Sequence, residues 1–266
     1  MVFEKKRSKM GRYFLSQMKL SCHKISKGKV QAGKMYFVKQ GSGKPVVYLH
    51  GWGCDGSVFT PIAKRLPNYD NYLVDFAGFG NSDPPPESGW TVEAYAEQLK
   101  EFLSEQNLRS VILVGHSFGC RVALVLAATR PELVERMLLV APAGLRRFSF
   151  KRWFKVAYYK TSKFFAGLFK RQPKLKYASQ DYADCSEGMR RTFVKVVNAD
   201  LSSYAKRISC PTLIVNGRQD AATPLKHAKR LNKLIKTSTL VQIDGDHFAF
   251  FRMPTAFANT VKNFVE

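Results

Sequence analysis

The sequence contains no long hydrophobic run, few acidic residues and no paired-cysteine motif. None of its stretches approaches the roughly 18 consecutive apolar residues that a membrane-spanning helix requires. Residues 1–44 carry a charge every few positions and lack the apolar centre of a secretory signal. The five cysteines are an odd number without CxxC spacing, which argues against a disulfide framework and against a zinc site. We therefore expect a cytoplasmic protein with no bound metal ion.

Positive charge is what the sequence has in excess, and two segments hold all of it. The chain has 43 Lys and Arg against 20 Asp and Glu, a net charge of +23. Residues 1–44 carry an excess of 11 positive charges and residues 141–207 an excess of 12, while the remaining segments cancel. With 45% hydrophobic and 13% aromatic residues the chain is not disordered, because disorder combines charge with a shortage of apolar side chains. Such basic segments either concentrate anionic partners or form a solvated lysine-rich surface.

Short apolar runs alternate with helical patterns along the near-neutral parts of the chain. This alternation predicts a mostly parallel sheet that helices cover on both faces, an α/β fold. The runs that we predict as strands span residues 45–50, 72–75, 111–115, 137–141, 212–216 and 240–243. The predicted helices span residues 91–106, 119–129 and 224–235, with Thr91 as an N-cap and Pro224 at a helix start.

The alternation stops after Gly144 and resumes at Cys210. No strand-like run occurs in between, and residues 146–171 mix Phe, Trp and Tyr with Lys and Arg. We therefore predict a helical insertion that packs over the carboxyl edge of the sheet. The predicted organisation is a basic N-terminal extension (1–34), an α/β core (35–144 and 208–266) and a helical cap (145–207).

The most specific motif is Gly115-His116-Ser117-Phe118-Gly119. It follows a predicted strand and opens a predicted helix, which is the context of a nucleophile elbow. In so sharp a turn a side chain at either glycine would collide with neighbouring backbone. Ser117 is then held in a strained conformation with its hydroxyl above the sheet, and we predict that it is a nucleophile.

A serine nucleophile needs a general base, and His247 is the best candidate among five histidines. His116 lies inside the elbow, where its side chain would point away from the hydroxyl. His50 ends a predicted strand and suits a structural hydrogen-bonding role. His23 and His227 lie in polar surroundings. His247 follows the last predicted strand and is chosen by elimination and by its place in the chain.

The base in turn needs an acid to orient it, and we predict Asp220 for this role. Asp220 follows the strand over residues 212–216, so it lies at the same sheet edge as Ser117. Asp244 and Asp246 are the competitors, but both are within three residues of His247, and so short a loop hinders a bond back to the imidazole. The order Ser, Asp, His is the one expected of this arrangement.

A tetrahedral intermediate also needs hydrogen-bond donors for its oxyanion. The backbone N–H of Phe118 qualifies because it begins a helix, where the dipole favours anions. The second donor should come from the glycine-rich loop after the first central strand, and the N–H of Trp52 is our candidate.

These motifs together resemble the α/β-hydrolase superfamily, over roughly residue 35 to the end of the chain. The resemblance rests on His50-Gly51-Trp52-Gly53, on residues 75–83, on the elbow, on Gly217–Asp220 with Pro224, and on Gly245-Asp246-His247. It implies a mostly parallel sheet, a helical cap after the sixth strand, and hydrolysis without a cofactor. Because Ser117 stands at the nucleophile position, the chain is unlike epoxide hydrolases and haloalkane dehalogenases, which have aspartate there.

Within this superfamily the chain looks most like the small carboxylesterases. We expect a serine hydrolase that cleaves a small-molecule carboxylic ester through an acyl-enzyme. Carbon–carbon bond hydrolases and acyl-carrier thioesterases share these motifs and stay open as alternatives. The alternative of another class is a non-catalytic protein that binds anionic surfaces through the basic cap. The expected partners of that cap are an anionic membrane, which would make the protein peripheral, or an acidic carrier protein, but not nucleic acid.

Overall fold

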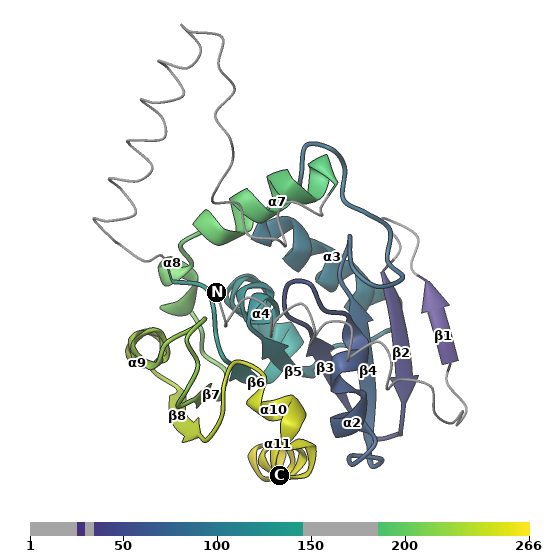
Figure 1. Cartoon of the computed structure of the whole chain (residues 1–266). Helices are drawn as coiled ribbons and strands as arrows, with labels where there is room; N and C mark the ends of the chain where they lie inside the picture. Colours follow the sequence, from purple (N-terminus) through teal and green to yellow (C-terminus); the bar gives the residue numbers. More distant parts are fainter. Residues whose placement is uncertain (1–25, 30–34, 146–185) are drawn as a thin grey trace, which may run out of the picture.

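The computed structural model describes residues 26–29, 35–145 and 186–266, and its centre is one mixed sheet (Figure 1). Its strand order is β1-β2-β4-β3-β5-β6-β7-β8, in which β2 pairs antiparallel with β1 and β4 and all other pairs are parallel. The strands are β1 (Ser26–Lys29), β2 (Tyr36–Gln40), β3 (Lys44–Leu49), β4 (Tyr69–Asp75), β5 (Val111–His116), β6 (Val134–Val140), β7 (Thr212–Gly217) and β8 (Ser238–Ile243). The expected α/β fold with a mostly parallel sheet is therefore confirmed.

Helices cover both faces of this sheet because successive side chains of each strand point to opposite sides. The α-helices are α2 (Thr60–Ala63), α3 (Val92–Glu105), α4 (Phe118–Thr129), α7 (Glu187–Asn198), α8 (Ser202–Ala205), α9 (Leu225–Leu234), α10 (Ala249–Arg252) and α11 (Pro254–Val265). Two 3-10 turns, η1 (Gly56–Phe59) and η2 (Pro131–Leu133), complete the described elements. Val47 and Leu49 face a core that contains α3, α4 and α9, whereas Val46 and Tyr48 face α2 and α11.

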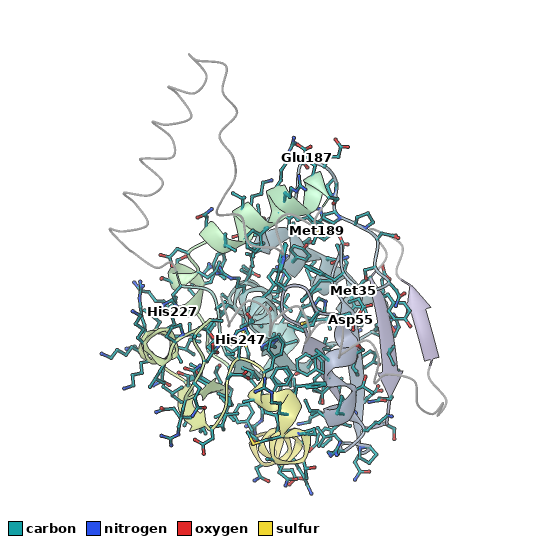
Figure 2. All side chains as sticks on the ribbon, viewed as in Figure 1. Met35, Asp55, Glu187, Met189, His227 and His247 are labelled. Atoms are coloured by element: carbon teal, nitrogen blue, oxygen red, sulfur yellow. The ribbon has the colours of Figure 1, made fainter. Side chains whose placement is uncertain are left out.

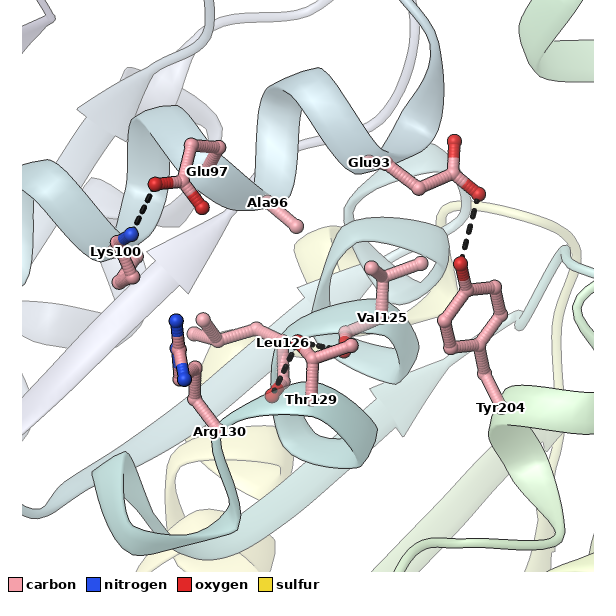
Figure 3. Close-up of a pocket in the computed structure, with 9 residues that line it drawn as sticks. All are labelled: Glu93, Ala96, Glu97, Lys100, Val125, Leu126, Thr129, Arg130 and Tyr204. Atoms are coloured by element: carbon pink, nitrogen blue, oxygen red, sulfur yellow. Dashed lines mark hydrogen bonds and ion pairs between the residues drawn. The ribbon is translucent and has the colours of Figure 1, made fainter.

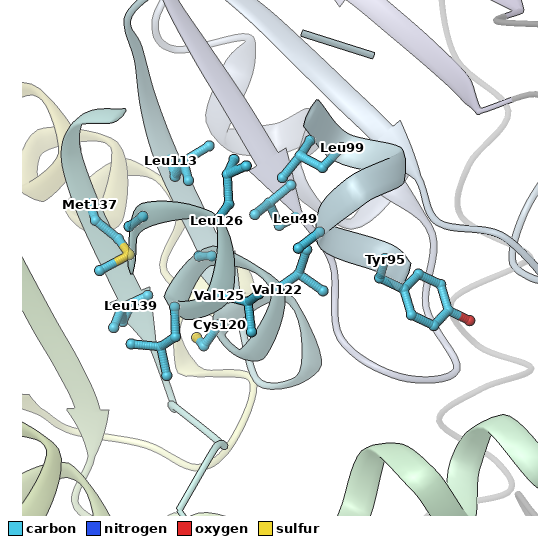
Figure 4. Packing of buried hydrophobic residues seen from close by; sticks show 14 of the residues in the cluster. Leu49, Tyr95, Leu99, Leu113, Cys120, Val122, Val125, Leu126, Met137 and Leu139 are labelled. Atoms are coloured by element: carbon cyan, nitrogen blue, oxygen red, sulfur yellow. The ribbon is translucent and has the colours of Figure 1, made fainter. Parts of the chain in front are cut away.

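The central strands are buried on both sides, as helical cover requires. Every residue of β5 is buried, and its sequence Val-Ile-Leu-Val is the continuous apolar run typical of interior parallel strands. Figure 4 shows the larger core, in which Leu49 and Leu113 of the sheet meet Val122 and Leu126 of α4. This core fixes α4, and with it the elbow, against the sheet.

The sequence located the six strands β3 to β8 and the helices α3, α4 and α9, with ends that differ by a few residues. Thr91 caps α3 as predicted, since its side chain accepts a hydrogen bond from the N–H of Ala94 at 3.3 Å. β4 and β6 begin three residues before the predicted starts. β1, β2, α2 and α11 were not predicted, and β1 lies within the stretch expected to be an extension, where it pairs with β2.

The described part of the expected cap is helical. Residues 186–207 form α7 and α8 and contain no strand, and the N–H of Leu201 donates to the carbonyl of Gly144 at 2.9 Å. That bond joins the two ends of the insertion where they leave the sheet. Residues 146–185 and 1–25 lie outside the described residues, so the cap and extension boundaries stay predictions. In the ranges that the structure describes, no helix is both long and apolar enough to cross a bilayer.

The start of α4 approaches β3 so closely that only glycine fits between them. A Cβ placed on Gly119 would overlap the carbonyl oxygen of Leu49, which is fixed backbone of a central strand. Gly53 differs, because a Cβ there would meet nothing within 4 Å although its φ is +74°.

Replacing Gly119 with Ala should therefore lower the free energy of unfolding by about 3 kcal/mol, at the upper end of overpacking costs. Gly53→Ala is the matched control, and its positive φ should cost about 1–2 kcal/mol. Urea unfolding followed by circular dichroism measures both. A Gly119→Ala protein as stable as Gly53→Ala would contradict the close approach.

Candidate active site

Ser117 lies in a strained turn at the carboxyl end of β5. Its φ and ψ are 49° and −100°, a region that a residue with a Cβ seldom adopts and that is enriched at functional sites. Its N–H donates to the carbonyl of Val140 on the neighbouring strand at 3.0 Å. A Cβ on Gly115 would lie 3.0 Å from the backbone nitrogen of Cys120, so both elbow glycines have the steric role expected of them.

Asp220 and His247 lie in hydrogen-bond contact at the same edge of the sheet. The Nδ1 atom of His247 is 2.9 Å from Oδ2 of Asp220. The two loops are also joined through backbone, since the N–H of Arg218 donates to the carbonyl of Ile243 and that of Gln219 to the carbonyl of Gly245. Figure 2 labels His247 on its loop near the centre of the view.

The carboxylate of Asp220 is buried and fully used as an acceptor. Oδ1 accepts from the N–H groups of Ala222 and Thr223, both at 2.8 Å, and Oδ2 accepts from the hydroxyl of Thr223 at 2.7 Å. Burial alone would raise the pKa of Asp220, but the hydrogen bonds from His247 and Thr223 outweigh it and hold that pKa below its usual value. Asp220 is therefore ionised at neutral pH and accepts a proton-bearing Nδ1, which leaves Nε2 of His247 as the basic nitrogen.

The competing carboxylates pair elsewhere. Asp244 lies 3.1 Å from Nε of Arg218, and Asp246 lies 2.8 Å from a guanidinium nitrogen of Arg252. Asp220 is thus the carboxylate that the structure brings to His247, and its role as the acid that orients the base stays a prediction.

His116 has a role that the sequence analysis missed. It is buried, its ring centroid lies 4.8 Å from that of His247, and its Nε2 lies 3.0 Å from the carbonyl oxygen of His247, to which it donates. Burial, and next the proximity of His247, lower the pKa of His116 to about 3, so its ring is neutral. The residue before Ser117 therefore holds the His247 loop against the elbow. No local signal in the sequence indicates a contact between residues so far apart in the chain.

His50 anchors the loop that contains Trp52, as its predicted structural role implies. Its Nδ1 lies 2.8 Å from the carbonyl of Gly51 and its Nε2 accepts the N–H of Phe76 at 2.9 Å. Burial lowers the pKa of His50 to about 4. A neutral imidazole can donate from one nitrogen and accept at the other, so it joins this loop to the end of β4.

The two predicted oxyanion donors belong to segments next to Ser117. A Cβ on Gly51 would be 3.6 Å from Cβ of Ser117, which places the Trp52 loop directly beside the elbow. Phe118 is the first residue of α4, so its N–H has no intrahelical acceptor. Within the described ranges neither the N–H of Trp52 nor that of Phe118 donates a hydrogen bond.

Aromatic rings fix the position of Trp52. Its ring packs edge-on against Phe79, Phe118 and Phe193, with centroid distances of 4.9, 5.5 and 5.1 Å. Phe193 belongs to α7 and was not singled out in the sequence, where it is one aromatic residue among many. The insertion thus contacts the residue that carries one of the two free N–H groups.

α7 is itself tied to the loop before α3. The hydroxyl of Thr192 accepts the N–H of Trp90 at 2.9 Å, and Nζ of Lys195 donates to the carbonyls of Ser88 and Gly89 at 2.9 and 2.8 Å. In Figure 2, Met189 points from α7 toward the body of the molecule, and it lies against Gly78. These contacts hold α7 over the carboxyl edge of the sheet.

A separate surface hollow of about 270 Å³ lies away from this edge, between α3, α4 and α8 (Figure 3). It is lined by the charged groups of Glu93, Glu97, Lys100 and Arg130, and Ser117 is not among its residues. In the part of the chain that the structure describes, no group of three or more His, Cys, Asp or Glu side chains could hold a metal ion.

Two family models match consecutive parts of the chain. Residues 44–174 match the model described as the alpha/beta hydrolase fold, and residues 176–266 match that of TAP-like proteins. The chain is 28% identical to a pimeloyl-[acyl-carrier protein] methyl ester esterase of Aeromonas salmonicida, over 85% of this chain and 96% of the relative. It is 27% identical to a putative esterase/lipase of Mycoplasma pneumoniae, over 83% of this chain and 88% of the relative.

Solved structures give the same fold. An esterase from Exiguobacterium antarcticum superposes with a TM-score of 0.72 at 24% identity, covering 92% of this chain and 99% of the other. The parallel sheet, the elbow between β5 and α4 and the family matches agree, and the chain belongs to the α/β-hydrolase superfamily.

Proposed function

We propose that this protein is a serine hydrolase that cleaves a carboxylic ester through an acyl-enzyme, with Ser117, His247 and Asp220 as its catalytic triad. The observation that carries the proposal is the buried, ionised Asp220 bonded to His247, whose loop is held against the strained Ser117 turn. The similarity to proteins named as esterases supports ester hydrolysis in particular.

In this mechanism Nε2 of His247 accepts the hydroxyl proton of Ser117 as its oxygen attacks the ester carbonyl carbon. Asp220 keeps the proton on Nδ1 and stabilises the imidazolium that forms. His247 then gives its proton to the departing alcohol as the carbon–oxygen bond breaks and the acyl-enzyme remains. A water molecule, deprotonated by His247, attacks the acyl carbon. The tetrahedral intermediate then collapses as the bond to the Ser117 oxygen breaks, that oxygen takes the proton from His247, and the acid is released.

The oxyanion of each intermediate would accept hydrogen bonds from the N–H groups of Trp52 and Phe118. Such donors contribute about 10²–10³ each in rate in enzymes where one has been removed. The glycines on both sides of Trp52 allow the ester close to the backbone.

Carbon–carbon bond and thioester hydrolysis would use the same three residues, so the substrate decides between them. A non-catalytic binding protein is the less favoured candidate. Holding Ser117 in a strained backbone costs stability, and a protein that only binds has no use for that strain. We further propose that residues 145–207 act as a cap, because α7 places Phe193 against Trp52.

Replacing Ser117 with Ala should abolish hydrolysis of p-nitrophenyl esters, because no attacking oxygen remains. We expect turnover at least about 10³-fold below that of the unmodified protein. Rates across acyl chain lengths would also report the size of the pocket. Unchanged circular dichroism serves as the control for folding, and retained turnover in Ser117→Ala would overturn the proposed nucleophile.

Replacing Asp220 with Asn should lower kcat by about 10⁴-fold, as expected when the base loses the partner that fixes its tautomer. The matched control is Asp244→Asn, because Asp244 pairs with Arg218 on the surface. Equal activity in the two variants would show that Asp220 does not orient the base.

The stabilising effect of Asp220 should depend on pH. Its pKa is lowered in the folded state, so its contribution is full above the pKa of the unfolded chain, about 4. It is lost as the pH falls through the lower folded value. The difference in free energy of unfolding between the unmodified protein and Asp220→Asn should therefore shrink below about pH 4. A difference that grows on acidification would contradict the direction of the pKa shift.

Replacing Phe193 with Ala should lower kcat about tenfold with little change in KM, because Trp52 loses one of its three ring contacts and its N–H becomes less precisely held. Val194→Ala on the same helix is the control, since Val194 is 47% exposed. A raised KM with unchanged kcat would instead show that Phe193 only binds substrate.

A further inference from the structure

The solvent side of α9 and the adjacent end of α8 carry a concentration of positive charge that the active site does not use. We call this the α8–α9 cationic face, and it consists of Lys206, Arg207, Lys226, Lys229, Arg230 and Lys233, all exposed. The two helices pack side by side (Figure 1), and a guanidinium nitrogen of Arg230 reaches the hydroxyl of Ser202 on α8 at 3.5 Å.

The four cations of α9 form one stripe. Lys226, Lys229, Arg230 and Lys233 are spaced i, i+3, i+4 and i+7, so they share a helix face, opposite the buried face of the helix. The stripe is about 10 Å long at 1.5 Å per residue. Neither α8 nor α9 contains an acidic residue.

This charge pattern opposes the stability of the helix that carries it. Like charges at i, i+3 and i, i+4 cost about 0.2–0.5 kcal/mol per pair. Lys226 lies in the first turn of α9, where the helix dipole favours a negative charge, and that turn contains no acid.

Nearby carboxylates do not pair with the three lysines of the stripe. Exposed cations elsewhere form ion pairs, for example Lys44 with Glu135 and Arg191 with Glu187. Among the described residues Lys226, Lys229 and Lys233 have no carboxylate within 4.0 Å. An external anionic partner would remove the repulsion that the chain leaves uncompensated.

We propose that the α8–α9 cationic face docks on an anionic lipid bilayer. A bilayer surface needs only a broad set of cations, since each Lys or Arg near it contributes independently of precise geometry. A protein partner would need apolar anchors at the centre of its interface. The large hydrophobic residues exposed in the described ranges are Val194, Val241 and Met253, and none of them lies on this face.

Docking in this way would bring the proposed active site close to the membrane. Asp220 stands on the loop that leads directly into α9, and Lys226 is in the first turn of that helix. The amino end of the stripe therefore lies at the same sheet edge as Ser117. Membrane docking depends only on the charge of α8 and α9, and it does not depend on which bond the enzyme cleaves.

The test measures vesicle binding by the full chain and by two variants with equal changes in net charge. The first, Lys226→Glu/Lys229→Glu/Lys233→Glu, reverses the stripe. The control, Lys64→Glu/Arg109→Glu/Arg130→Glu, reverses three exposed cations on other elements. Sedimentation uses phosphatidylcholine vesicles with and without phosphatidylglycerol, at about 0.15 M salt.

We expect the unmodified protein to bind only the vesicles that contain phosphatidylglycerol. The stripe variant should bind them about a hundredfold more weakly, since each cation near the surface is worth about fivefold, and the control less than about threefold. Both variants should hydrolyse a soluble ester at the unmodified rate without vesicles, which separates this test from the proposed function.

Three results would overturn the proposal. The first is equal binding to neutral and anionic vesicles, and the second is an equal loss of binding in the two variants, because net charge alone would then explain it. The third concerns polyuridylate and polyglutamate. If the stripe variant loses as much affinity for either of these as it loses for the anionic vesicles, the face binds polyanions in general.

Discussion

The turn at Ser117 is the constraint on which the site depends. Ser117 has a positive φ although it has a Cβ, and α4 approaches β3 closely at Gly119. The neighbouring strands must also be held in fixed positions. Strain of this kind costs about 1–3 kcal/mol and persists only where the surroundings determine the backbone. Here the fully buried strand β5 and the hydrogen bond from the N–H of Ser117 to the carbonyl of Val140 fix the backbone of the turn. The interior of the sheet thus holds the elbow in place, and the loops around it are positioned in turn from the elbow.

Three imidazoles at this sheet edge have different electrostatic environments, and the difference assigns their roles. His50 and His116 are buried with pKa values lowered to about 4 and 3, so both stay neutral and act as hydrogen-bonding supports. His247 alone bonds to a carboxylate, Asp220, which can stabilise the imidazolium. A proton transferred during catalysis would therefore reside on His247. The neutral neighbours keep backbone segments aligned without competing for the proton.

Local patterns were enough to predict the central strands, Ser117, and the loops with Asp220 and His247. Each of these follows from a short apolar run and from the rule that parallel strands end at one edge. The contacts of His116 with His247 and of Phe193 with Trp52 could not be predicted, because the two residues of each contact lie more than 100 positions apart in the chain. Their existence depends on how loops and the insertion pack. β1 and β2 were missed because their sequences alternate weakly and their pairing is with each other and with β4.

The same limit explains why the charge of α9 escaped the sequence analysis. Residues 208–266 carry only four excess positive charges, because the acids Asp220, Asp244, Asp246 and Glu266 offset half of the cations. None of these acids belongs to α9, so the sum conceals a helix whose charge has one sign. α3 packs on the same face of the sheet and carries four Glu and one Lys, with Glu93 in its first turn and a Glu97–Lys100 pair. Packing on this sheet therefore does not require a basic helix, and the charge of α9 calls for an explanation outside the fold.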